Sequence, residues 1–266
     1  MNPTNIEYLD FTWNILTGCL GPNSDGQRCS YCYAHRLANG RLKSLYLSHR
    51  FQLAGDMRDP FAPRFWRYRL EEPLARHKPA RIGVAFMGDL FGSWVPKATH
   101  DLIFDVINRC RQHTFLLLTN QPQNLIKWSP FPENCWVGVT ATNHDSFLKA
   151  AVYLLYVEAS VKFISFEPLL GGIGDALWPE KDKWTKHTFV PDWVIIGAQT
   201  KPYKPPEQKW VREIVEAADK AAIPVFLKNN LLPMMKASHI PSWVRENLRQ
   251  EFPVSLTAPS ANKKGE

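Results

Sequence analysis

The chain has 266 residues, of which 45% are hydrophobic and 12% aromatic, so it can bury a large core and is neither fibrous nor disordered in composition. It contains no stretch of about 18 consecutive apolar residues, and its first residues lack the basic and apolar regions of a secretory signal. We therefore expect a cytoplasmic protein with no membrane partner. The formal charge of +7 favours anionic partners.

Short apolar runs rich in β-branched and aromatic residues recur along the chain, each followed by polar residues, Gly or Pro. They predict seven strands, at residues 11–16, 81–87, 114–119, 135–141, 161–166, 192–197 and 223–228. Helical periodicity lies between them, at residues 32–47, 98–111, 145–157 and 207–221.

Strands that are apolar throughout and alternate with helices indicate a parallel sheet covered on both faces. We therefore expect an α/β fold with a mainly parallel sheet, arranged as a full or incomplete (β/α) barrel, with a doubly wound open sheet as the alternative. Residues 1–255 are predicted to form one domain, and the tail at 256–266 is predicted to be disordered.

Chemistry in both folds belongs at the carboxyl ends of the strands, where the loops gather. Nearly every predicted strand in this sequence ends in a small or polar group. The residues singled out on this basis are Gly88, Asp89, Thr119, Thr140, Thr142, Asn143, Glu167 and Lys228. Such a ring of polar strand ends predicts a lined cavity.

Three of the five cysteines, Cys19, Cys29 and Cys32, lie in one short segment between the first predicted strand and the first predicted helix. A C-x2-C pair at a helix N-terminus has its thiolates stabilised by backbone N–H groups and the helix dipole. Three thiolates can hold three irons of a [4Fe–4S] cluster and leave the fourth iron open. Two alternatives remain: a Cys3His zinc site that includes His35, and thiols that are close only in sequence.

The order of strand, three-cysteine loop, helix and partial barrel, with Tyr31 before the last cysteine, resembles the radical S-adenosylmethionine (SAM) enzymes. More narrowly, the segments FTWNILTGC, CSYCYAHRLA, FMGDLFGSWVP, LLLTNQPQNL, CWVGVTATN, FISFEPLLGGI, DWVIIGAQT and PVFLKNN resemble successive blocks of the phage Gp37/Gp68-like family. The resemblance runs from about Thr12 to Asn230. The gap of nine residues before Cys29 departs from the commoner C-x3-C-x2-C spacing, and Gln199 stands where the family usually has Glu.

The resemblance implies a [4Fe–4S] cluster whose open iron binds SAM, and a 5′-deoxyadenosyl radical that removes a hydrogen atom from a substrate. It implies an electron donor of the flavodoxin or ferredoxin type. Asp89 would accept from the SAM ammonium, although it could instead cap a short helix at residues 90–94, and Gly88 would permit a close backbone approach. The other residues assigned to the cofactor are Tyr31, beside the adenine, and Thr119, Thr140, Thr142 and Asn143.

Glu167 and Lys228 end the fifth and seventh predicted strands, which a barrel brings to one mouth. They are predicted as catalytic residues, with a structural ion pair as an equally weighted alternative.

Residues 62–72 interleave the cations Arg64, Arg67 and Arg69 with aromatic residues that include Trp66. Such a pattern can contact phosphates while stacking on bases, although a helix with its aromatic residues in the core gives the same letters. Together with the phage resemblance, it leads to the hypothesis of a radical SAM enzyme that acts on a modified, thymidine-derived base in DNA or on its nucleotide. Two alternatives are radical chemistry on a peptide or small metabolite, and a non-catalytic nucleic-acid-binding module with a zinc-stapled loop.

Overall fold

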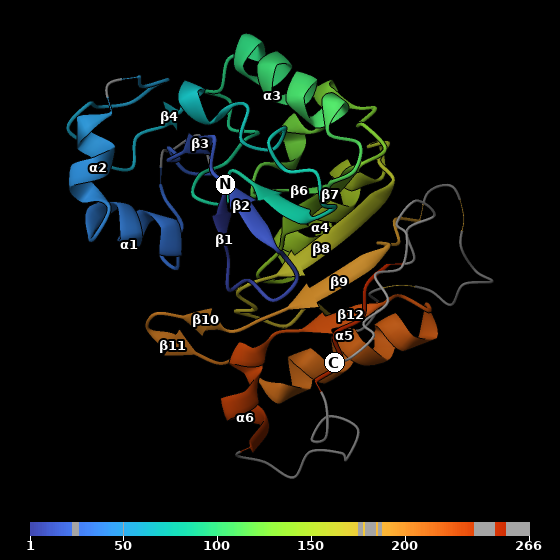
Figure 1. The fold of residues 1–266 in the computed structure, drawn as a ribbon. Coiled ribbons are helices and arrows are strands. Elements are labelled where there is room, and N and C mark those ends of the chain that lie inside the picture. The colour runs from blue at the N-terminus through green and yellow to red at the C-terminus, as the bar shows by residue number, and fades with distance from the viewer. Residues whose placement is uncertain are drawn as a thin grey trace, which may run out of the picture.

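An eight-stranded sheet forms the centre of the computed structural model, which describes residues 1–22, 27–49, 51–174, 178, 185, 188–236 and 248–253 (Figure 1). In spatial order its strands are β1 (Asn2–Pro3), β2 (Phe11–Trp13), β5 (Arg81–Val84), β6 (Thr114–Thr119), β7 (Cys135–Thr140), β8 (Val161–Phe166), β9 (Trp193–Ile196) and β12 (Val225–Leu227). The short strand β1 runs antiparallel to β2, and the other neighbours are parallel.

The strand order decides between the two predicted architectures. A doubly wound sheet reverses its direction of growth at a switch point, whereas here each later main strand is added on the same side of the previous one. The described sheet ends at β1 on one side and at β12 on the other. The fold is therefore an α/β fold with an incomplete (β/α) barrel, and the first of the two predictions is confirmed.

Three longer helices follow strands of the sheet and pack on its outer face: α3 (Lys97–Arg109), α4 (His144–Leu154) and α5 (Gln208–Lys220). Their bounds lie within a few residues of the predicted ones. Other short elements are β10 (Gln199–Thr200), β11 (Tyr203–Lys204), α6 (Leu232–Lys236) and the 3-10 turns Arg67–Arg69, Pro122–Asn124, Ile126–Trp128 and Asn229–Leu231. No helix in the described ranges is long and apolar enough to cross a membrane.

Three predicted elements are wrong in their extent, one of them the strand predicted at residues 81–87, which ends at Val84. The helix predicted at residues 32–47 is two helices, α1 (Tyr33–Asn39) and α2 (Lys43–Ser48), because the backbone at Gly40 leaves the helical conformation and ends α1. The strand predicted at residues 11–16 ends at Trp13, and its last part contributes to a separate strand, β3 (Leu16–Thr17). This strand pairs with β4 (Arg64–Phe65) and the chain turns away from the main sheet there. The predicted tail, residues 256–266, lies outside the described residues.

Both faces of the sheet are buried, and they carry different side chains. One face packs against α3, α4 and α5 and contributes to the larger hydrophobic cluster. The opposite face, which lines the inside of the incomplete barrel, holds a second cluster made of Tyr8, Leu9, Leu116, Trp136, Val161, Phe163, Trp193, Ile195 and Phe226. Several of its rings meet edge to face, including Tyr8 on Trp193 with centroids 5.7 Å apart. The lower part of the barrel interior is therefore filled with aromatic side chains.

The alternation of strand residues carries this inner face up to the carboxyl ends of the strands. Because side chains on one face of a strand recur every second residue, the positions after Phe163 on the inner face are Ser165 and Glu167, and the position after Phe226 is Lys228. Thr140 follows Trp136 in the same way on β7. The inner face thus changes from aromatic to polar as the strands end, and the polar part opens into a cavity.

Candidate functional site

A cavity of about 320 Å³ lies at the carboxyl ends of the parallel strands, within the size range of small-molecule sites. Two walls of different origin face each other across it. The first, called here the cysteine wall, is the loop from Gly18 to Cys32, of which residues 23–26 are not described. The second, called the strand wall, carries Thr140, Glu167 and Lys228 at the ends of β7, β8 and β12.

All three thiols of the cysteine wall contribute to the lining of this cavity. Cys19, Cys29 and Cys32 are partly buried and carry no disulfide. They are close enough to raise one another's pKa, since the charges of Cys29 and Cys32 both act on Cys19. No three Cys, His, Asp or Glu side chains of the described chain are gathered tightly enough to hold one metal ion.

Burial governs the protonation of these thiols. It raises the pKa of Cys19, Cys29 and Cys32, and the backbone N–H groups that contact two of the sulfurs only moderate the effect. The Sγ of Cys19 accepts from the Gly21 N–H at 3.2 Å, and the Sγ of Cys32, the N-cap of α1, accepts from the His35 N–H at 3.3 Å. The cavity therefore favours neutral thiols on its own, and thiolates would form there when a cationic centre binds.

The ring of His35 has a partner other than the three sulfurs. It packs edge to face on Phe61, with ring centroids 5.3 Å apart, and it does not contribute to the cavity wall. Burial lowers the pKa of this imidazole. The closed tetrahedral arrangement that a Cys3His zinc site requires is therefore not formed by these four residues, in line with the absence of any described cluster suited to one ion.

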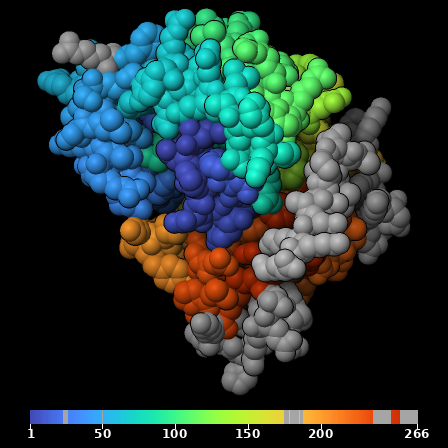
Figure 2. Space-filling view, viewed as in Figure 1, coloured from blue at the N-terminus to red at the C-terminus, as the bar shows by residue number. Residues whose placement is uncertain are grey.

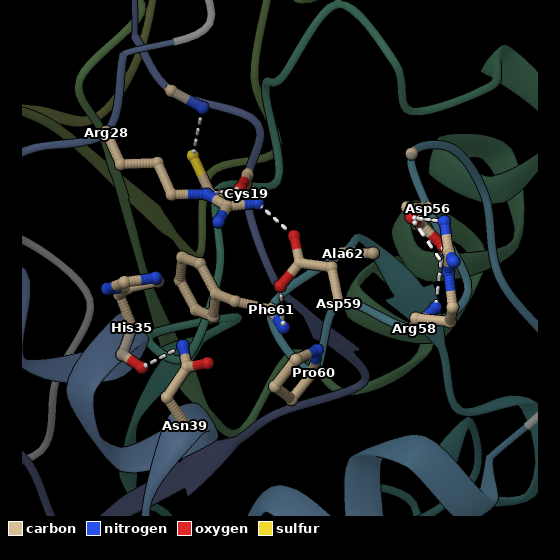
Figure 3. Close-up of polar contacts among 12 residues, drawn as sticks. Cys19, Arg28, His35, Asn39, Asp56, Arg58, Asp59, Pro60, Phe61 and Ala62 are labelled. Carbon is tan, nitrogen blue, oxygen red and sulfur yellow. Dashed lines mark hydrogen bonds and ion pairs between the residues drawn. The ribbon is translucent and has the colours of Figure 1, made fainter.

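Arg28 fastens the cysteine wall to the neighbouring loop (Figure 3). Its Nε donates to the Cys19 carbonyl at 3.0 Å, and its guanidinium pairs with the Asp59 carboxylate. The other oxygen of Asp59 accepts from the Phe61 N–H at 2.8 Å, and the Phe61 carbonyl in turn accepts from the Cys19 N–H at 3.0 Å. The backbone of Cys19 is thus held on both sides by one connected set of contacts.

Two glycines let the cysteine wall approach the end of β5. Gly18 has a φ of +86°, and a Cβ there would lie 2.3 Å from the Ala62 carbonyl oxygen. A Cβ on Gly88 would lie 2.7 Å from the Gly18 carbonyl oxygen, and these two residues form a parallel bridge. The close backbone approach predicted at Gly88 is therefore made by the chain itself, directly before Cys19.

Asp89 follows β5, and its side chain contacts the end of the neighbouring strand β6. Its side chain is 4% exposed and borders the cavity. The four donors to its carboxylate are the Thr119 hydroxyl at 2.7 Å, the N–H groups of Phe91 and Asn120 at 3.0 and 3.2 Å, and the Gln121 amide at 3.4 Å. Burial raises the pKa of this carboxyl despite these donors. The helix predicted at residues 90–94 does not form, so Asp89 caps a turn rather than a helix.

Charges on the strand wall are paired. The Lys228 Nζ lies 2.6 Å from the Glu167 Oε1 and 3.5 Å from a carboxylate oxygen of Glu7. The second oxygen of Glu167 accepts from the hydroxyls of Tyr8 at 3.0 Å and Ser165 at 3.2 Å. Burial by itself would lower the pKa of Lys228, but the attraction of Glu167 and Glu7 outweighs it and the pKa is raised. Burial, followed by the charge of Glu167, raises the pKa of Tyr8.

The family described as "Protein of unknown function (DUF5131)" matches residues 3–236. The chain belongs to this family. Searches of curated proteins and of solved structures found no match. Every residue that lines the cavity, from Ile6 to Asn230, falls within the part of the chain that the DUF5131 family covers.

The other residues assigned to the cofactor divide into two groups. Tyr31 and Thr140 border the cavity, and the Tyr31 hydroxyl is hydrogen-bonded to the Cys29 thiol. Thr142 and Asn143 lie outside the lining: the Thr142 N–H donates to the Ser146 hydroxyl, and the Asn143 side chain forms a capping box with Ser146 at the start of α4. These contacts of Thr142 and Asn143 stabilise the start of α4.

The basic aromatic segment is buried from Ala62 to Trp66, which contradicts the predicted nucleic-acid contact for Arg64 and Trp66. Arg64 is 1% exposed and donates to five backbone carbonyls, while the indole N–H of Trp66 donates to the Thr17 hydroxyl at 2.8 Å. Arg69 pairs with Glu72 and donates to the Asn14 carbonyl. Of the four residues predicted to contact nucleic acid, Arg67 alone is exposed. The segment pairs with β3 and donates a hydrogen bond to Thr17, directly before the cysteine wall.

Sequence reasoning missed several groups at the site. Glu7 and Tyr8 lie between β1 and β2 in a stretch without a motif, and Ser165 lies inside β8. The alternation of β8 was the available signal for Ser165, because it places this residue on the same face as Glu167. Arg28 stands directly before Cys29, and this position of a cation beside a cysteine pair was the available signal for it.

Proposed function

We propose that this protein is a radical SAM enzyme, in accordance with its resemblance to that superfamily and to the phage Gp37/Gp68-like family. The observation that supports the proposal most is the convergence of three free cysteines on one cavity at the carboxyl ends of parallel strands. A [4Fe–4S] cluster takes each thiolate on a different iron, so three thiols around one cavity suit it in number.

The chain's own groups suit such a cofactor in chemical type. Cys19, Cys29 and Cys32 would hold a [4Fe–4S] cluster, whose positive irons would offset the raised pKa values of the thiols. When bound, the reduced cluster would supply an electron that cleaves SAM to methionine and a 5′-deoxyadenosyl radical, which removes a hydrogen atom from the substrate. The electron donor would be a flavodoxin or ferredoxin type protein in a reducing compartment such as the cytoplasm.

Asp89 and Thr140 would serve the cofactor from the other strand ends. The carboxyl group of Asp89 lies at the cavity wall, held by four donors, and as a carboxylate it would attract the ammonium of SAM without having to reorient. Thr119 would act through Asp89 as a positioning residue. Thr140 borders the cavity and would offer its hydroxyl to a ligand.

Glu167 and Lys228 would face the substrate as catalytic residues. Their ion pair lines the cavity, and Tyr8 and Ser165 hold the carboxylate in place. A substrate that offers both a donor and an acceptor would exchange contacts with this pair without leaving either charge unpaired. We propose a modified base of DNA, or its nucleotide, as that substrate, on the basis of the phage resemblance.

Anaerobic incubation with SAM and dithionite tests the reaction class. We expect purified, iron-loaded protein to be brown, to bleach on reduction and to release 5′-deoxyadenosine, which chromatography detects. Colourless protein that carries stoichiometric zinc would contradict the proposal and favour the zinc-stapled module. Brown protein that forms no 5′-deoxyadenosine, with or without DNA, would also count against it.

A further inference from the structure

Several cations between residues 56 and 81 are compensated by neighbouring groups in the structure. Of the seven Lys and Arg residues in this range, three pair with a carboxylate: Arg58 with Asp56 at 2.9 Å, Arg69 with Glu72 at 3.1 Å, and Arg81 with Asp10 at 3.6 Å. Arg64 is buried among backbone carbonyls. These cations have little charge left to offer to a partner.

A second group has no such compensation. Residues 27–49 contain no Asp or Glu, yet they include Arg36, Arg41 and Lys43, all exposed and without a carboxylate partner in the described part of the chain. The β10–β11 hairpin adds Lys201 and Lys204, which are also exposed and have no described carboxylate partner. These five residues, Arg36, Arg41, Lys43, Lys201 and Lys204, are called the cationic rim.

The segments that carry Arg36, Lys201 and Lys204 border the cavity. Helix α1 contributes Tyr33 and Ala34 to the cavity lining, and the hairpin contributes Gln199 and Thr200. The two segments touch, because the Arg36 guanidinium donates to the Lys201 carbonyl. Figure 2 shows α1 and α2, in blue, meeting the hairpin, in orange, on the same side of the molecule.

Aromatic side chains are interleaved with these cations. Tyr33 on α1 is 41% exposed, and Tyr203 on the hairpin is 43% exposed. Cations that track a phosphate backbone, combined with aromatic faces on which bases stack, are the elements of single-strand nucleic-acid binding. An acidic polypeptide would use the cations and leave the aromatic faces without a stacking partner.

We propose that the cationic rim binds the phosphate backbone of a single-stranded nucleic acid and directs one nucleotide into the cavity. This inference rests on the proposed function for what happens in the cavity, but strand binding itself requires neither SAM nor reduction. It moves the nucleic-acid contact from residues 62–72, where the sequence placed it, to α1, α2 and the β10–β11 hairpin.

Fluorescence anisotropy with a labelled single-stranded oligodeoxynucleotide, over a series of salt concentrations, tests this surface on the full chain. We expect salt-dependent binding that weakens in the double variant Lys201→Ala/Lys204→Ala, which keeps the Lys201 carbonyl that Arg36 contacts. If both lysines contact phosphates, the slope of log K against log salt falls by about 1.4, since each contact to a single strand contributes about 0.7.

The matched control is Lys149→Ala/Lys220→Ala, which removes the same charge from two exposed lysines on α4 and α5. Equal weakening by both double variants would show that only net charge matters and would overturn the proposal. Absence of binding by the unsubstituted chain would overturn it as well. So would equal competition by polyglutamate, because the rim would then recognise acidic polymers in general.

The outcomes for the rim and for the reaction are separable. Oligonucleotide binding that is lost in the rim variant, without any 5′-deoxyadenosine formation, would support the nucleic-acid surface and contradict the proposed reaction. Release of 5′-deoxyadenosine from SAM alone by the rim variant, at the rate of the unsubstituted chain but without oligonucleotide binding by either, would contradict the rim and support the reaction class.

Discussion

The two walls of the cavity are built by different means. The strand wall is a continuation of the sheet: regular alternation places Thr140, Glu167 and Lys228 on the inner face where their strands end. The cysteine wall is an irregular loop that leaves the sheet after Trp13 and is held by contacts with residues 59–66. One wall follows from local periodicity, and the other depends on partners more than 30 residues away in the chain.

The walls also differ in how their polar groups are compensated. On the strand wall, Lys228 lies between two carboxylates and Glu167 accepts two further hydroxyl hydrogen bonds, so burial does not leave a charge unpaired. On the cysteine wall, burial raises the pKa of all three thiols. The buried charges of the strand wall are therefore paired within the protein. The thiols of the cysteine wall, in contrast, would be stabilised as thiolates by a bound cation.

The largest expected effect concerns the cysteine wall. Replacing Cys29 and Cys32 together by Ser removes two ligands of the proposed cluster, so we expect the iron content to fall from about four per chain to near zero and the colour to be lost. Iron analysis of anaerobically reconstituted protein measures this. Cys110→Ala, which removes a buried thiol outside the cavity, is expected to keep its iron. Full iron loading of the double Ser variant would contradict the ligand assignment.

The next effect concerns the strand wall. Lys228→Met leaves Glu7 and Glu167 buried without their cation, and we expect it to lower the free energy of unfolding by about 3 kcal/mol, as measured by urea denaturation. Lys149→Met, on the exposed face of α4, should change it by less than about 0.5 kcal/mol. Equal stability of the two variants would mean that the pair is not stabilising.

The same comparison has a predictable pH dependence. The pKa of Lys228 is raised above its ordinary value of 10.5, so its stabilising contribution is fully present below that pH and is lost as the pH rises through the raised pKa. The stability difference between the unsubstituted chain and Lys228→Met is therefore expected to stay constant from neutral pH to about 10 and to shrink above it. A difference that already narrows near neutral pH would assign the effect to another group.

Smaller effects are expected from single hydrogen bonds on the strand wall. Tyr8→Phe removes the phenol that donates to Glu167 at 3.0 Å and keeps the ring among Trp193 and Phe226. We expect a loss of about 1.5 kcal/mol, because hydrogen bonds to charged groups contribute more than neutral ones. Urea denaturation measures it, and an unchanged midpoint would show that the hydroxyl contributes nothing to the carboxylate.

The smallest expected effect on stability is at the ion pair that fastens the cysteine wall. Arg28 and Asp59 are each about a quarter exposed, at 26% and 23%, so Asp59→Asn should cost about 1 kcal/mol or less. Its effect on the loop is more informative: we expect faster alkylation of Cys19 by iodoacetamide, with mass spectrometry as the measurement. Unchanged alkylation would show that the Phe61 and Ala62 backbone contacts suffice to hold the loop.

Much of the fold could be predicted because it rests on local patterns. Six of the predicted strands, the one at residues 81–87 and the five from residue 114 onward, fall on β5 to β9 and β12, and the predicted helices at 98–111, 145–157 and 207–221 match α3, α4 and α5. Apolar runs bounded by turn residues carry this information within a few residues. The cavity was predicted from the small and polar residues at the ends of the strands. The same observation predicted Thr140, Glu167 and Lys228, which form its strand wall.

The sequence by itself determined the order of strands and helices, the alternation of side chains between the two faces of each strand, and the gathering of the three cysteines before α1. Tertiary structure alone decided that Arg64 and Trp66 turn inward while Arg36 and Lys201 meet at the cavity mouth. It also joined Glu7 and Tyr8 to Glu167 and Lys228, across more than 150 residues. The physical reason is that periodicity reports only which side of an element is buried, whereas the partner of a buried charge is chosen by packing between distant elements.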